Sequence, residues 1–271
     1  MSSEVKLATI RGFRLVTSDP DRLRAFYVAL GFTAADPVPI GAAEIEALGL
    51  VGDGHRTSMK LGESRLDLDC FDRGGRPYPA DADAADLIFQ HLALVTSDVR
   101  SAWARAMAAG ASAISRRGPV TLPPSAGGVT AVKFRDPDGH PLELLEFPAG
   151  ANPTWSGEGM MGIDHSAVSI AAVEDSIRFY TLHGLRVGNC TLNHGPTQVA
   201  LDGLEDVVVD VVPMQPRDET PHVELLRYRT PTGRSYPMAA TNDIAATRIV
   251  WEANQHALLR DPDGHLHQLS R

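Results

Sequence analysis

The chain has few cysteines and no long apolar run, and both shortages narrow the kinds of protein it can be. Its 271 residues include two cysteines, Cys70 and Cys190, too few for a disulfide framework. No apolar run approaches the roughly 18 residues of a membrane-spanning helix. Each cysteine lies in an apolar, strand-like stretch, so we expect two buried free thiols and a reducing, cytoplasmic location.

Positive charge is also scarce. The formal net charge is −9, and lysine and arginine form no block. Nucleic acid and anionic membrane surfaces are therefore not expected as partners. The first residues, Met1–Lys6, lack the basic-then-apolar pattern of a signal peptide. With 43% apolar and 22% charged residues, the composition is typical of a globular protein that buries a core.

The most informative feature present is a repeated hexapeptide, Arg-Asp-Pro-Asp-Gly-His, at Arg135–His140 and Arg260–His265. Asp-Pro-Asp-Gly favours a tight turn, because proline presets φ, aspartate bonds nearby backbone and glycine accepts positive φ. Apolar segments flank the turns, so each copy predicts a hairpin between two strands. We interpret the two histidines as structural parts of these turns. An exact repeat 125 positions apart indicates internal duplication.

Further repeats divide the chain into four units. Phe26-Tyr27 recurs as Phe179-Tyr180, and a Gly-Arg-x-Tyr-Pro loop at 75–79 recurs at 233–237, where an architectural role is the first interpretation. Each unit predicts a strand, a capped helix ending at glycine, and three strands. The units cover 7–74, 86–148, 161–230 and a truncated 243–271. An insertion at 36–56 is expected to be an ordered loop. The linker Pro148–Met161 suggests two domains, 1–150 and 151–271.

This pattern resembles the vicinal oxygen chelate superfamily, which includes glyoxalase I, extradiol dioxygenases and bleomycin-resistance proteins. The stretch Phe134–Phe147, with Asp-Pro-Asp-Gly-His followed by Leu-Glu-Leu, carries the resemblance most specifically. The resemblance implies an α+β fold of four βαβββ-type units, the fourth truncated, forming two paired-module half-barrels. It also implies a divalent metal ion at the base of a cup made by two units.

The resemblance also implies where metal ligands would lie: one residue on the first strand of a unit and a carboxylate on the last. In units two and three these positions hold His91 with Glu143 and His165 with Glu224. In units one and four they hold Gly12 with Asp67 and Arg248 with Gln268. Arg248 is interpreted either as a plug that neutralises Asp67 or as an anion binder. His222, on the same strand face as Glu224, is a possible substitute ligand or proton carrier.

Two ways of pairing the units remain open. If neighbours pair, each cup holds half a metal site. If units two and three pair, as in some fused glyoxalase I forms, one cup gathers His91, Glu143, His165 and Glu224. We adopt this crossed pairing as a hypothesis, because only units two and three retain both ligands. Two imidazoles and two carboxylates suit Zn²⁺, Ni²⁺, Mn²⁺ or Fe²⁺.

By the same resemblance, we expect a metal-dependent isomerase or lyase acting on a small substrate with vicinal oxygens. Glu143 is the first candidate for the general base, and Glu224, at the equivalent position of unit three, is the second. The alternatives are a metal-free, bleomycin-resistance-like binding protein and an Fe(II) extradiol-type dioxygenase, whose expected ligand positions hold His165, Arg248 and Gln268. The expected partner is a small-molecule substrate, and the chain is a monomer or a homodimer.

Overall fold

The computed structural model describes residues 5–218 and 220–270, and three complete units are present within them. Unit one comprises β1 (Ile10–Val16), α1 (Pro20–Ala29), β2 (Thr33–Ala34), β3 (Val38–Pro39), α2 (Ala42–Ala47), β4 (Gly54–Leu61) and β5 (Ser64–Phe71). Unit two comprises β6 (Gln90–Thr96), α3 (Val99–Ala108), β7 (Ser112–Ala113), β8 (Val120–Thr121), the 3₁₀ turn η1 (Pro124–Ala126), β9 (Thr130–Arg135) and β10 (Pro141–Glu146).

Unit three repeats this plan, and unit four is reduced to strands. Unit three comprises β11 (Met160–Ser169), α4 (Val173–Leu182), β12 (Arg186–Val187), β13 (Thr191–His194), α5 (Pro196–Asp202), β14 (Val208–Gln215) and β15 (His222–Thr230). Unit four comprises β16 (Arg248–Glu252), β17 (Ala257–Arg260) and β18 (Leu266–Ser270), with no helix in its described part. The expected loop at 36–56 is wrong, because this stretch contains β3 and α2, and unit three carries α5 at the equivalent place.

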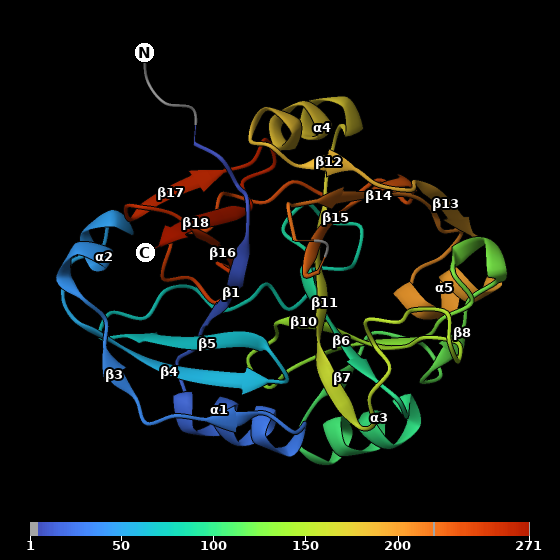
Figure 1. The fold of residues 1–271 in the computed structure, drawn as a ribbon, viewed down its shortest axis with the longest axis horizontal. Helices are drawn as coiled ribbons and strands as arrows, with labels where there is room; N and C mark the ends of the chain where they lie inside the picture. Colours follow the sequence, from blue (N-terminus) through green and yellow to red (C-terminus); the bar gives the residue numbers. More distant parts are fainter. Residues whose placement is uncertain (1–4, 219, 271) are drawn as a thin grey trace.

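The units pair crosswise into two mixed sheets (Figure 1). Units two and three form one sheet, joined by the antiparallel strands β6 and β11. Units one and four form the other, joined by β1 and β16. We call the concave faces of these sheets the 2–3 cup and the 1–4 cup. The predicted crossed pairing and the α+β fold are therefore confirmed. Each sheet draws strands from both halves of the sequence, while the boundary at residue 150 stays a prediction.

The strand registers of the two sheets are equivalent, residue for residue. His165 lies opposite Ala93 in one sheet, and Gly12 lies opposite Val250 in the other. The last strands obey the same rule: Glu143 pairs with Ala93, and Gln268 pairs with Val250. The alignment of the four units made from the sequence is thus confirmed in space.

Alternation along the strands separates the core from the cups. Leu142 and Leu144 are fully buried in the main hydrophobic core, where the sheets pack with the helices. Glu143 between them points to the opposite face, because successive side chains of a strand alternate. The same alternation turns Leu92 and Leu94 toward the core and His91 toward the 2–3 cup. Burial of the leucines therefore sets the direction of the polar side chains.

The repeated hexapeptide is a turn that is closed by its first aspartate. The Asp136 carboxylate accepts hydrogen bonds from the backbone N–H groups of Asp138 and His140, at 2.9 and 3.0 Å. It also accepts one from the Tyr27 hydroxyl at 3.0 Å. Asp261 receives the equivalent bonds in the second copy, including one from Tyr180 at 3.1 Å. The repeated tyrosines and the repeated turns are therefore one structural device.

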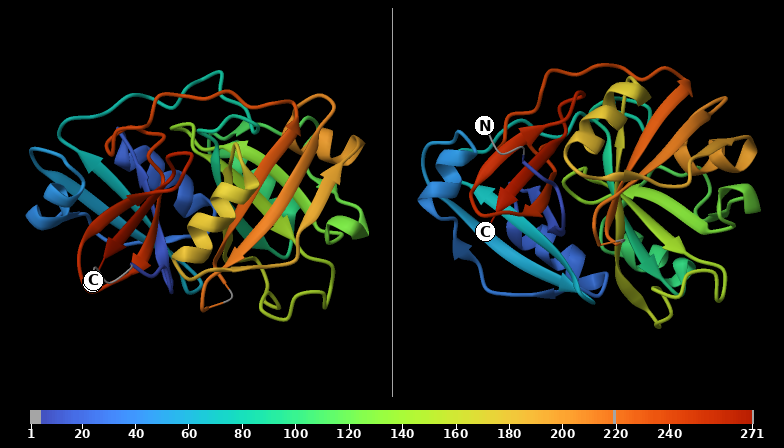
Figure 2. Two further views of the ribbon diagram at one scale, coloured as in Figure 1. Left: turned by 90° about the horizontal axis from the view of Figure 1, so that it is seen from above. Right: turned by 45° about the horizontal axis from the view of Figure 1, so that its top comes forward.

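Two long linkers cross between the sheets, and each carries one copy of the Gly-Arg-x-Tyr-Pro repeat (Figure 2). Arg76, on the linker from unit one to unit two, binds the Asp243 carboxylate at 2.7 and 3.0 Å. Arg234, on the linker from unit three to unit four, binds Asp86 at 2.6 and 3.0 Å. A Cβ atom at Gly233 would lie 1.8 Å from the Ala85 carbonyl oxygen, so only glycine fits there. The motif therefore fastens the crossing linkers.

The cysteine prediction is wrong for one residue. Cys190 is exposed, and Cys70 is only partly buried. Cys190 lies at the edge of the sheet, just before β13, where its neighbours do not cover it. Both are free thiols, as expected. Among the described helices, none has the length and apolar character needed to cross a membrane.

Burial of His267 on β18 predicts that the folded protein loses stability in acid. Trp251 donates from Nε1 to Nδ1 of His267 at 3.0 Å, so the neutral ring carries its proton on Nε2, which faces the Tyr180 hydroxyl at 3.1 Å. Burial lowers the pKa of His267 to about 4. The unfolded chain, with a pKa of about 6.5, binds this proton first. We expect about 3 kcal/mol of unfolding free energy to be lost as pH falls from about 6.5 to 4.

Chemical denaturation at several pH values checks this expectation. In His267→Gln the amide can still accept from Trp251 and donate to Tyr180, but it does not titrate. The variant should therefore lose less stability than the wild type over this pH range. His55→Gln, at an exposed histidine, serves as the matched control and should keep the wild-type slope. An identical slope in His267→Gln and wild type would contradict the prediction.

Candidate functional site

The 2–3 cup brings the predicted ligands of units two and three onto adjacent rows of one sheet face. One row consists of Glu143, Ala93, His165 and His222, and the next consists of His91, Ala167 and Glu224. Fully buried alanines occupy the middle positions. Because alanine has a short side chain, the larger polar groups on both sides can reach across it. The register thus explains how four strands direct polar side chains at one region.

Three of the four predicted ligands converge closely. His91 Nε2 lies 3.0 Å from Glu143 Oε2, and His165 Nε2 lies 3.9 Å from the same oxygen. The candidate ligand atoms of these three residues all lie within 4.8 Å of one another. Glu224 is farther out and joins the group through His165, with its Oε2 atom 3.5 Å from Nε2. We call these four residues the His–Glu cluster.

His165 is held in an orientation that suits a metal ligand. Its Nδ1 atom lies 2.9 Å from the Asp164 carboxylate, which also accepts a hydrogen bond from Trp155 Nε1 at 2.7 Å. Its Nε2 atom is buried and has no hydrogen-bond partner among the described residues. Carboxylates commonly orient metal-binding histidines in this way. Burial alone would lower the pKa of His165, but Glu224, Asp164 and Glu143 raise it to about 9.

The pKa shifts of His91, Glu143 and Glu224 favour a neutral imidazole beside two ionised carboxylates. Burial, followed by the Lys133 charge, lowers the pKa of His91, which favours the neutral imidazole that binds metals. Burial would raise the pKa of Glu143, yet Lys133 and the hydrogen bond with His91 hold it below its usual range. For Glu224, His165 and His222 outweigh burial and lower the pKa to about 2. Two carboxylates and an orphaned imidazole nitrogen fit a divalent cation.

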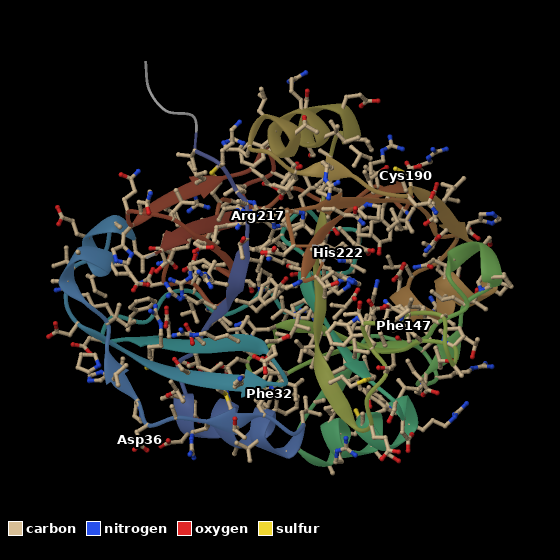
Figure 3. All side chains as sticks on the ribbon, in the orientation of Figure 1. Phe32, Asp36, Phe147, Cys190, Arg217 and His222 are labelled. Atoms are coloured by element: carbon tan, nitrogen blue, oxygen red, sulfur yellow. The ribbon has the colours of Figure 1, made fainter. Side chains whose placement is uncertain are left out.

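His222 lies at the margin of the His–Glu cluster. Its Nε2 atom is 3.5 Å from Glu224 Oε1, and its Nδ1 atom is 4.0 Å from Asp164 Oδ2. Asp164, His165 and His222 form a second group with metal-ligand spacing. Figure 3 shows His222 in the same half of the molecule as Phe147, far from Asp36 at the other end. This geometry fits both roles predicted for His222, a substitute ligand and a proton carrier.

The His–Glu cluster opens into a cavity of about 390 Å³. Helix α5 and the turn η1 close one side, and strands β9, β13 and β14 supply further walls. Several polar residues that sequence reasoning missed line this cavity, among them Lys133, Asp164, Asn193, Gln198 and Tyr228. The hairpin register about the Asp-Pro-Asp-Gly turn places Lys133 opposite Glu143, a signal that was available in the sequence. No comparable pattern in the sequence predicts that α5 packs beside this cavity.

The 1–4 cup holds a network of buried ion pairs beside a cavity of about 830 Å³ that Gly12, Arg14, Asp67 and Val250 help to line. Gly12, Asp67, Arg248 and Gln268 occupy the positions equivalent to the His–Glu cluster. Gly12 cannot become histidine in place, because its φ is +154° and a Cβ atom would lie 2.6 Å from the Arg65 carbonyl oxygen. No metal-ligand group is found in this cup among the described residues.

Glu44 of α2 inserts into the 1–4 cup as an internal anion. Its carboxylate contacts Arg14 and accepts bonds from Arg56 at 2.7 and 3.0 Å and from Gln268 at 2.7 Å. Arg248 is fully buried and donates to Asp69 at 2.9 Å. The plug predicted for Arg248 is therefore present, but its partner is Asp69, because Arg14 and Arg65 occupy Asp67.

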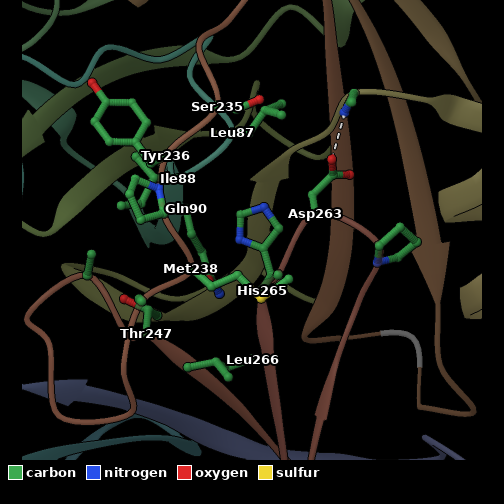
Figure 4. Close-up of a pocket in the computed structure, with 16 residues that line it drawn as sticks. Leu87, Ile88, Gln90, Ser235, Tyr236, Met238, Thr247, Asp263, His265 and Leu266 are labelled. Atoms are coloured by element: carbon green, nitrogen blue, oxygen red, sulfur yellow. Dashed lines mark hydrogen bonds between the residues drawn. The ribbon is translucent and has the colours of Figure 1, made fainter.

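A separate cavity of about 340 Å³ lies beside the linker from unit three to unit four (Figure 4). Tyr236, Gln90 and His265 contribute to its lining, and none of the His–Glu cluster does. His265 is held by the Ser169 carbonyl oxygen, 2.9 Å from Nε2. This contact agrees with the structural role predicted for the turn histidines.

Comparisons with known proteins agree with this geometry. The model of the glyoxalase/bleomycin resistance protein/dioxygenase superfamily matches residues 9–144, just over half of the chain. Glyoxalase I from Zea mays superposes with a TM-score of 0.58 at 16% identity, covering 96% of this chain and 91% of the other. A Bacillus subtilis protein described as a candidate dioxygenase gives 0.57 at 13% identity, covering 98% and 85%. No curated protein matches the chain.

The structural likenesses establish a shared fold, and the family model adds a match in sequence. The matched stretch contains β1 through most of β10, including His91 and Glu143. The crossed sheets, the Asp-Pro-Asp-Gly-His turns and this match point to one conclusion. The chain belongs to the glyoxalase/bleomycin resistance protein/dioxygenase superfamily.

Proposed function

We propose that this protein is a metal-dependent isomerase or lyase that acts on a small substrate with two neighbouring oxygens. The observation that carries the proposal is the convergence of His91, Glu143 and His165 at a cavity, where the buried Nε2 atom of His165 accepts or donates no hydrogen bond among the described residues. His91, Glu143, His165 and Glu224 would hold the ion, which we expect to be zinc, nickel, manganese or iron. Both cups are complete within one chain, so a monomer suffices.

Glu143 is the proposed general base. When bound, a divalent ion supplies Lewis-acid stabilisation of negative charge on the substrate oxygens. Glu143 then takes a proton from the carbon next to the carbonyl group. Lys133 and His91 hold the pKa of Glu143 below its usual range against the effect of burial, so this carboxylate is ionised at neutral pH.

Glu224 and His222 are the proposed route by which the proton leaves. The Glu224 side chain is 20% exposed, against 8% for Glu143, so it lies closer to solvent. His222 Nε2 lies 3.5 Å from Glu224 Oε1 and can exchange a proton with it after a small approach. Glu224 remains the mirror candidate for the base, because it occupies the equivalent position in unit three.

The dioxygenase alternative has less support. The positions expected to hold its iron contain His165, Arg248 and Gln268. His165 belongs to the sheet of units two and three, whereas Arg248 and Gln268 belong to the sheet of units one and four. Arginine and glutamine are also unsuitable members of a two-histidine, one-carboxylate set. These three side chains do not share a cup.

Neighbour pairing would have favoured the metal-free binding alternative, because each cup would then hold only half of a metal site. Crossed pairing instead gathers both half-sites in the 2–3 cup. This arrangement supports metal binding over ligand sequestration. Metal content and turnover of the purified protein distinguish the two functions directly.

Metal analysis of purified and reconstituted protein tests the proposal. We expect about one divalent ion per chain in the wild type. His91→Ala and His165→Ala should each lose bound metal, because each removes a nitrogen ligand from the same site. His55→Ala, at an exposed histidine of unit one, should retain it. Loss in only one of the two cluster variants would refute a shared site, and a wild type that binds no metal would refute the proposed function.

A further inference from the structure

Several residues that line the cavity of the His–Glu cluster have buried polar atoms without a hydrogen-bond partner among the described residues. Eleven buried side-chain polar atoms have no hydrogen-bond partner among the described residues, and five of them belong to residues that line this one cavity. Two of the five are on His91 and His165. The other three are Asn193 Oδ1, Gln198 Oε1 and the Tyr228 hydroxyl. Buried polar groups usually find partners, so these atoms point to polar groups of a ligand.

Gln198 presents an acceptor whose orientation is decided by its neighbour. Its Nε2 atom donates to Asp202 Oδ2 at 2.8 Å. Because an ionised carboxylate only accepts hydrogen bonds, the amide nitrogen must face Asp202. The amide oxygen is then left buried and unpartnered on a residue of the cavity wall. It requires a donor from the ligand, such as a hydroxyl group.

Tyr228 presents the complementary donor. Burial and the nearby Asp202 charge raise the pKa of its hydroxyl well above the usual range, so it stays protonated. The Asp202 carboxylate is near this hydroxyl but lies outside ordinary hydrogen-bond geometry, and the oxygen has no other partner among the described residues. A ligand hydroxyl can accept from Tyr228 and donate to Gln198, because one hydroxyl group has both capacities.

The charge of the cavity argues against a ligand with several negative groups. Lys133 is the one lysine or arginine among the lining residues, all of which are described. Its Nζ atom is already paired with Asp202 Oδ1 at 2.6 Å. Glu143, Asp164 and Glu224 also line the cavity, and a divalent ion would offset only part of their charge. An additional buried carboxylate without a cation would be costly to desolvate.

We propose that the substrate is a small polyhydroxylated carbonyl compound, with hydroxyl groups beyond the vicinal oxygen pair and at most one negative charge. This inference rests on the proposed metal-dependent function. It excludes thiol conjugates that carry two carboxylates, because this cavity offers no free cation to receive them. Gln198 and Tyr228 are specificity-determining residues in this assignment.

Three hydroxamates test the substrate class, because each offers the same pair of neighbouring oxygens on a different tail. The probes are acetohydroxamate, a trihydroxylated four-carbon hydroxamate and a hydroxamate attached to glutathione, which carries two carboxylates. Calorimetric titration of the metal-loaded chain gives their affinities. We expect the trihydroxylated probe to bind about tenfold more tightly than acetohydroxamate, from two or more additional hydrogen bonds. The glutathione-linked probe should gain nothing over acetohydroxamate.

A tyrosine variant connects this preference to the cavity wall. Tyr228→Phe keeps the ring and removes the donor, so the preference for the trihydroxylated probe should fall by about two- to tenfold. Tyr236→Phe, outside this cavity, should keep the wild-type preference. Tightest binding of the glutathione-linked probe, equal binding of the first two probes, or an unchanged preference in Tyr228→Phe would each overturn the inference. If no hydroxamate binds to a chain that holds metal, or no metal binds, the proposed function itself fails.

Discussion

Replacement of Glu143 by glutamine is expected to reduce turnover of the metal-loaded protein by about 10²- to 10⁴-fold, the usual contribution of a positioned general base. Glutamine has nearly the same shape, so the strand and the core beneath it should be retained. It cannot accept a proton from carbon. Glu143 is 6% exposed and lies 3.0 Å from His91, so no bulk water is placed to replace it.

Incorporation of deuterium from D₂O into an α-hydroxy ketone such as dihydroxyacetone measures this step. Metal content must be determined in parallel, because glutamine is also a weaker ligand than glutamate. Glu224→Gln is the informative companion variant, since Glu224 occupies the equivalent position in unit three. Full exchange in Glu143→Gln with loss in Glu224→Gln would assign the base to Glu224. Full exchange in both would exclude either carboxylate from this role.

Replacement of Asp69 by asparagine is expected to cost about 3–5 kcal/mol of unfolding free energy, as for other buried ion pairs that lose one partner. The Asp69 side chain is 0% exposed and accepts bonds from Arg56 at 2.6 and 2.8 Å and from Arg248 at 2.9 Å. Two nitrogens of Arg248 already have no partner. Asparagine removes the negative charge and leaves one acceptor oxygen in place of two, so the buried guanidinium groups of Arg56 and Arg248 would lose a neutralising partner.

Chemical denaturation measures this loss. Asp210→Asn provides the matched control, because Asp210 bonds Arg229 at 2.6 and 2.8 Å near the surface. Exposed pairs contribute about 1 kcal/mol or less, so this control should be close to wild type. Equal small losses in both variants would show that the network in the 1–4 cup does not stabilise the fold.

The two cups share one fold but hold different side chains. In the 2–3 cup, His91, Glu143 and His165 leave a nitrogen free at a cavity. In the 1–4 cup, α2 inserts Glu44 between arginines, and ion pairs link most of the charged groups. Two nitrogens of Arg248 and the Oε1 atom of Gln268 have no hydrogen-bond partner among the described residues. Strand register is common to both cups. The identity of a few inward-facing side chains decides whether a cup gathers a group of metal ligands or a network of ion pairs.

Much of the fold could be predicted because its signals are local and repeated. Asp19 and Asp98 cap their helices, and Gly31, Gly110 and Gly184 follow the three long helices with φ of +101°. Duplication then allowed four units to be aligned, and loss of the histidines from units one and four indicated the crossed pairing. Prediction failed for α2, read as a loop, and for Cys190, whose strand-like neighbours did not bury it.

The sequence by itself determined the unit plan, the turn chemistry and which residues face the cups, because a period of two along a strand assigns every side chain to a face. Only the tertiary structure decided how those side chains interact. It placed Asp164 behind His165, brought Asp202 of α5 to Lys133, and left Gln198 and Tyr228 open to the cavity. The Asp202–Lys133 pair joins residues of different units, and all of these distances depend on how the sheets curve and pack, which no local pattern records.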